Sequence, residues 1–140
     1  GKYTVSDRVL RAVQAEFSCG FCTDAQGAQT IGKTFRENHY LLDTHTAVAC
    51  TVLDAYRSGT GDQTLTVVES TASPFKFCAS VLDALGVTEH APGTGVLAQL
   101  TAETGRPAPK PLASLAGKPV RFDQVTDRGD MRAVVTEFLR

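Results

Sequence analysis

The most informative stretch of the sequence is Leu65-Thr66-Val67-Val68-Glu69-Ser70-Thr71-Ala72-Ser73-Pro74, at residues 65–74. Its first four residues are apolar or β-branched, a composition that predicts an interior strand. Ser73 can cap a helix that follows, and Pro74 suits the first position of that helix. Open α/β sheets bind ligands outside the carboxyl ends of their strands, so Ser70, Thr71 and Ser73 form a candidate ligand-binding edge. Serine and threonine before a helix are more often only caps, so spacing alone leaves the binding role open.

Helical patterns flank this strand on both sides. Apolar residues recur at spacings of three and four in the segments 7–17, 25–38, 46–56, 75–85, 96–100 and 131–139. Thr23 and Gln26 form a capping box before the second of these segments. Asp43 or Thr44 can cap the third, whose wide apolar face predicts burial. We therefore expect an α/β fold rich in helices, in which a few parallel strands are flanked by helices.

The composition argues against several functional classes. The 140 residues suffice for one domain, and 42% hydrophobic with 21% charged residues is ordinary for a globular fold. Fourteen basic and fifteen acidic residues give a net charge of −1, so we expect neither nucleic acid nor an anionic membrane as a partner. No apolar run approaches the roughly 20 residues of a spanning helix, and residues 1–7 lack the pattern of a signal peptide. We expect a cytoplasmic protein.

Two of the four cysteines, Cys19 and Cys22, form a C-x-x-C pair. Such a pair is compatible with thiol redox chemistry or with half of a zinc site. Cys50 and Cys78 stand alone, so no second pair completes a metal site, and we assign no metal ligand. Buried cysteines that behave as small hydrophobic residues are the third interpretation.

Five segments resemble segments of threonine synthases, in the same order along the chain. They are Gly1-Lys2-Tyr3, residues 40–49 (YLLDTHTAVA), residues 68–77 (VESTASPFKF), residues 91–94 (APGT) and residues 117–121 (GKPVR). The second segment resembles a D-P-H-T-A-V motif, with Thr44 in place of the proline. The likeness covers essentially the whole chain, so we expect residues 1–140 to form one C-terminal fragment of a threonine synthase-like domain.

This resemblance implies a fold type II enzyme that depends on pyridoxal 5′-phosphate (PLP). Such enzymes convert O-phospho-L-homoserine and water to L-threonine and phosphate, with the cofactor as the electron sink. In the family a hydroxyl of the S-T-A-x-P segment contacts the pyridine nitrogen of PLP. The matching residue here is Thr71, with Ser70 as its neighbour. Unlike a carboxylate, a neutral hydroxyl does not hold that nitrogen protonated, so it moderates the electron sink.

The resemblance also implies what the chain lacks. The Schiff-base lysine and the phosphate-cradling loop of the family lie upstream of the part resembled here, so we assign no catalytic residue and expect the isolated chain to be inactive. Lys76 lies near the candidate site, where it can bind substrate phosphate or serve as a surface residue. His45 can face substrate or satisfy a helix cap.

Other functions stay open at this point. Another type II PLP lyase or synthase shares the hydroxyl arrangement at Thr71, and a non-catalytic interaction module derived from the same fold is a further alternative. Because the segment 46–56 carries a wide apolar face, we also expect the isolated chain to self-associate.

Overall fold

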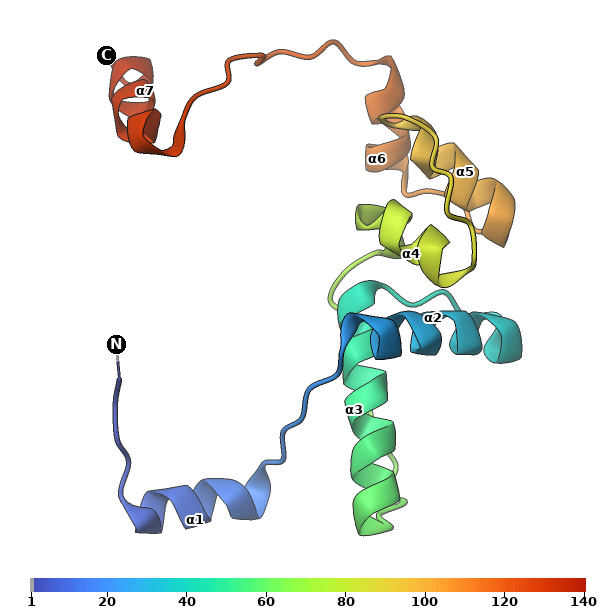
Figure 1. Ribbon diagram of the computed structural model, residues 1–140, viewed down its shortest axis with the longest axis vertical. Helices are drawn as coiled ribbons and strands as arrows, with labels where there is room; N and C mark the ends of the chain where they lie inside the picture. The colour runs from blue at the N-terminus through green and yellow to red at the C-terminus, as the bar shows by residue number, and fades with distance from the viewer. Residues whose placement is uncertain (1) are drawn as a thin grey trace.

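The computed structural model describes residues 2–140, so Gly1, the first residue of the segments quoted above, lies outside the described part. The chain consists of helices joined by extended segments (Figure 1). The α-helices are α1 (Asp7–Glu16), α2 (Asp24–Asn38), α3 (Thr44–Thr60), α4 (Cys78–Ala84), α5 (Gly95–Thr104), α6 (Lys110–Ala113) and α7 (Met131–Phe138). Three 3-10 turns are η1 (Pro74–Lys76), η2 (Ser114–Gly117) and η3 (Arg128–Asp130).

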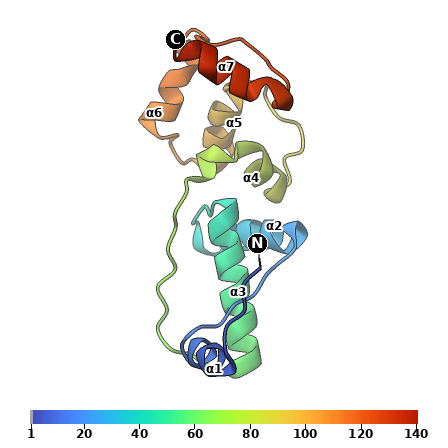
Figure 2. The same ribbon diagram turned by 90° about the vertical axis from the view of Figure 1, so that its left-hand side faces the viewer.

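The expected α/β class is wrong for the structure, because residues 2–140 contain no strand. Residues 65–68 are extended but unpaired, and Leu65 and Val67 are 94% and 87% exposed. Figure 2 shows the segment after α3 running back toward α4 as a single extended stretch. A strand needs a neighbour for its backbone N–H and C=O groups, and the described residues supply none here. The β-branched composition therefore gives an extended backbone without a sheet.

Local capping signals fix the starts of α2 and α3 where the sequence predicts them. Thr23 and Gln26 form the predicted capping box, with the Gln26 N–H donating to Thr23 Oγ1 at 3.3 Å and the Thr23 N–H donating to Gln26 Oε1 at 2.8 Å. Asp43, not Thr44, caps α3. Ser73 accepts from the Phe75 N–H at 3.3 Å, but the helix after it is a single 3-10 turn before α4 begins. These contacts span three residues or fewer, so local sequence determines them.

The core lies where α2 packs on α3 and α4, and where α4 packs on α5 (Figure 1). Its buried apolar residues are Ile31, Leu41, Leu42, Ala47, Phe75, Cys78, Val81, Leu82 and Leu100. The predicted stripes of the segments 25–38, 75–85 and 96–100 supply most of this core. The helices α1 and α7 lie away from it and bury no residue. The wide face of α3 is also less buried than predicted, because Val48 and Tyr56 are exposed.

Gly32 marks the closest approach of α2 to α4. A Cβ built on Gly32 would lie 2.7 Å from the backbone oxygen of Ala84, too close for the two helices to keep their spacing. Gly32→Ala is therefore expected to lower the free energy of unfolding by about 1–3 kcal/mol, although alanine favours helix. Gly59→Ala in α3 is the matched control, because open space surrounds Gly59, and it should raise stability by up to about 1 kcal/mol. Urea titrations that rank Gly32→Ala at or above the parent would contradict this packing.

Candidate functional site

The start of α3 is organised around the carboxylate of Asp43, which is 1% exposed. Its Oδ1 atom accepts hydrogen bonds from the His45 N–H at 2.8 Å and from the Thr46 N–H at 3.3 Å. Its Oδ2 atom accepts a hydrogen bond from the hydroxyl of Thr46. Both carboxylate oxygens are thus occupied, and Oδ1 satisfies two backbone donors that the first turn of a helix leaves unpaired.

These hydrogen bonds decide the charge of Asp43. Burial alone would raise the pKa of its carboxyl. The hydrogen bonds from the Thr46 hydroxyl and from the N–H groups of His45 and Thr46 outweigh burial, and the net pKa lies below the ordinary value of 3.8. Asp43 is therefore a carboxylate at neutral pH, which makes it an acceptor and never a donor.

Thr46 joins this helix start to the hydroxyl-rich segment at Ser70. The two side-chain oxygens, Thr46 Oγ1 and Ser70 Oγ, lie 3.2 Å apart. Thr46 is 4% exposed, whereas Ser70 and Thr71 are exposed. The contact brings together two segments, 40–49 and 68–77, that are separate in the sequence. It places the Ser70 hydroxyl between a buried polar network and the surface.

A cationic and aromatic cluster forms on the exposed side of the same helix start. The rings of His45 and Phe77 are tilted with centroids 5.1 Å apart, and Lys76 Nζ lies 5.9 Å from the centroid of Phe77. His45 Nδ1 is also 3.3 Å from Thr44 Oγ1 and 3.5 Å from Asp43 Oδ1. Phe77 is half-buried, and its ring is near both His45 and Lys76. A lysine ammonium suits an anionic group.

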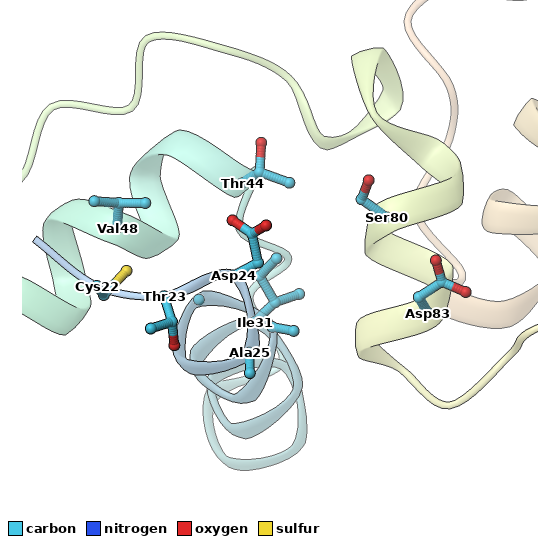
Figure 3. A pocket seen from close by; sticks show the side chains of 11 residues that line it. Cys22, Thr23, Asp24, Ala25, Ile31, Thr44, Val48, Ser80 and Asp83 are labelled. Atoms are coloured by element: carbon cyan, nitrogen blue, oxygen red, sulfur yellow. The ribbon is translucent and has the colours of Figure 1, made fainter.

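The structure also contains a cavity that the sequence did not predict. Figure 3 shows the residues that line this cavity, which lies between α2 with the residues just before it, the first turns of α3, and α4. Its volume is about 570 Å³. Asp24, Thr44, Ser80 and Asp83 supply its polar groups, and Ile31 contributes apolar surface. Ser70, Thr71, Lys76 and His45 do not line it. The cavity arises where three helices meet, which no spacing within one segment reveals.

The cysteines do not form one common site. Cys19 lines a surface hollow beside Tyr56, whereas Cys22 lines the cavity of Figure 3. Burial raises the pKa of the Cys78 thiol, whose Sγ donates to the backbone oxygen of Phe75 at 3.2 Å. Burial likewise raises the pKa of Cys50, with added repulsion from Asp54 and Asp43. Cys78 thus behaves as a small buried hydrophobic residue.

Residues 2–140 contain neither a cluster of metal-binding side chains nor a helix that could span a membrane. Across residues 2–140, no three side chains of histidine, cysteine, aspartate or glutamate gather into a group that could hold a metal ion. The helices of this part are too short or too polar for any of them to cross a bilayer.

Comparison with known proteins places these features in a family. The family model described as "Threonine synthase, C-terminal" matches residues 46–136, which include Thr46, Ser70, Thr71, Lys76 and Phe77. Asp43 and His45 lie directly before the match.

Proteins named threonine synthase-like 1 are similar to the chain. The mouse (Mus musculus) protein is 33% identical over 82 residues, which cover 58% of this chain and 10% of the relative. The human (Homo sapiens) protein is 28% identical over 87 residues, which cover 62% of this chain and 11% of the relative. The chain thus spans about a tenth of the length of these relatives. Because the family match extends over more than half of its residues, the chain belongs to the threonine synthase C-terminal family.

Proposed function

We propose that the chain is the C-terminal segment of a PLP-dependent threonine synthase, which converts O-phospho-L-homoserine and water to L-threonine and phosphate. The contact between Thr46 and Ser70 carries this proposal, because it joins the two segments that resemble the enzyme most closely. The same two segments also contain His45, Phe77 and Lys76, whose contacts join them a second time. We further propose that residues 1–140 act as one unit of a longer cytoplasmic polypeptide, and that the isolated chain is inactive.

The hydroxyls of Ser70 and Thr71 fit the pyridine nitrogen of PLP. They lie on neighbouring residues at the exposed end of an extended segment, and a hydroxyl can either donate to a ring nitrogen or accept from it. Bound PLP supplies the electron sink for proton removal next to the amino group of the substrate. The role of Ser70 and Thr71 is to orient the ring through its nitrogen. The lysine that would bind the cofactor covalently comes, in this proposal, from another part of the polypeptide.

Lys76 and His45 bind the phosphate group of the substrate in this proposal. O-Phospho-L-homoserine carries a dianionic phosphate, and a lysine ammonium is a compact donor for it. Lys76 is exposed and lies over Phe77, which also contacts the ring of His45. Each of the two residues thus lies near Phe77, and both can donate to an anion. They would hold the substrate while the hydroxyls of Ser70 and Thr71 hold the cofactor.

Phosphate release from O-phospho-L-homoserine tests the function. The natural full-length protein, assayed with and without added PLP, is expected to release phosphate and form threonine only with PLP. Lys76→Ala is expected to lower kcat/KM several-fold, because it removes a cation that holds the phosphate both in the bound substrate and as it leaves. Lys118→Ala, at an exposed position outside the cluster, is the matched control.

The negative outcomes separate the alternatives. A protein that binds PLP but releases no phosphate would be another type II lyase or synthase. A protein that does not bind PLP would be an interaction module.

Self-association of the isolated chain is a separate proposal, supported by exposed apolar residues. Val48 and Tyr56 on α3 are exposed, and so are Val9 and Val13 on α1 and Phe138 on α7. Exposed apolar faces of this kind favour association. Light scattering of the 140-residue chain is expected to give a mass above that of a monomer at micromolar concentration. A monodisperse monomer would count against the proposal.

A further inference from the structure

We draw no further inference here: the strongest candidate, the cavity between α2, α3 and α4, is lined by the exposed carboxylates of Asp24 and Asp83, and residues 2–140 hold no buried, unpartnered polar side chain that would point to a ligand there.

Discussion

Leu82→Ala is expected to lower the free energy of unfolding by about 2–5 kcal/mol. Leu82 lies in α4, is 0% exposed, and is among the largest fully buried side chains of the chain. Its helix contacts both α2 and α5, so a cavity at this position faces two packing interfaces. Domains of this size have a total free energy of unfolding of about 5–15 kcal/mol, so truncating one such side chain removes a large share of that free energy.

Leu115→Ala is the matched control for Leu82→Ala. Leu115 lies in η2 and is exposed, so the same change of side chain should alter stability by no more than about 0.5 kcal/mol. The chain has no tryptophan, so far-UV circular dichroism in a urea titration is the suitable readout. Equal effects of the two substitutions would mean that α4 does not lie at the centre of the core.

Local signals made the helices predictable from the sequence. The capping box of Thr23 and Gln26 and the cap at Asp43 depend on contacts within three residues. The buried positions Ile31 and Leu82 follow from apolar spacing within one helix. Each of these features is decided inside a single segment, so the sequence contains the information that determines it.

The strand predicted at residues 65–68 does not form, because local composition does not determine strand pairing in the same way. β-Branched residues favour an extended backbone, but a strand also needs a partner, and partners are not encoded in the segment itself. In the structure Arg57 donates to the Thr64 oxygen at 3.0 Å and to Thr66 Oγ1 at 3.2 Å, so side-chain contacts accompany this segment. Apolar spacing also predicted burial for the face of α3, although Val48 is exposed. Periodicity identifies a face and does not identify what covers it.

The site residues stay a prediction, whereas the contacts that join them could not be predicted from the sequence. Resemblance singled out Ser70, Thr71, Lys76 and His45, and the structure places His45 and Lys76 around Phe77 and Ser70 against Thr46. Neither Phe77 nor Thr46 was predicted as a site residue, because their roles arise from contacts between separate segments. Thr46 and Ser70, for example, are 24 residues apart. The only sequence signal of Phe77 and Thr46 was membership of the two segments that carry the resemblance.

Asp43→Ala is expected to lower the free energy of unfolding by about 3 kcal/mol. Loss of an N-terminal cap costs about 0.5–2 kcal/mol, and a buried hydroxyl left without its acceptor adds about 1–3 kcal/mol. Thr46 is that hydroxyl, since it donates to Asp43. Asp54→Ala is the control, because Asp54 is exposed on the same helix and its replacement should change stability by about 0.5 kcal/mol or less. Similar losses in both variants would show that the cap of α3 is unimportant.

The pH dependence of the stability of Asp43→Asn separates two contributions of Asp43, that of its negative charge and that of its capping hydrogen bonds. The pKa of Asp43 is lower in the folded protein than its ordinary value of 3.8, so the folded state holds the proton less tightly than the unfolded state. Its contribution to stability is therefore fully present above about pH 4 and is lost as the pH falls through the folded pKa. Asparagine keeps one acceptor oxygen for the cap but cannot titrate, so the stability difference between parent and Asp43→Asn should shrink in acid. The measurement is urea unfolding from pH 7 to pH 3, and a difference that stays constant over this range would mean that Asp43 stabilises α3 without its charge.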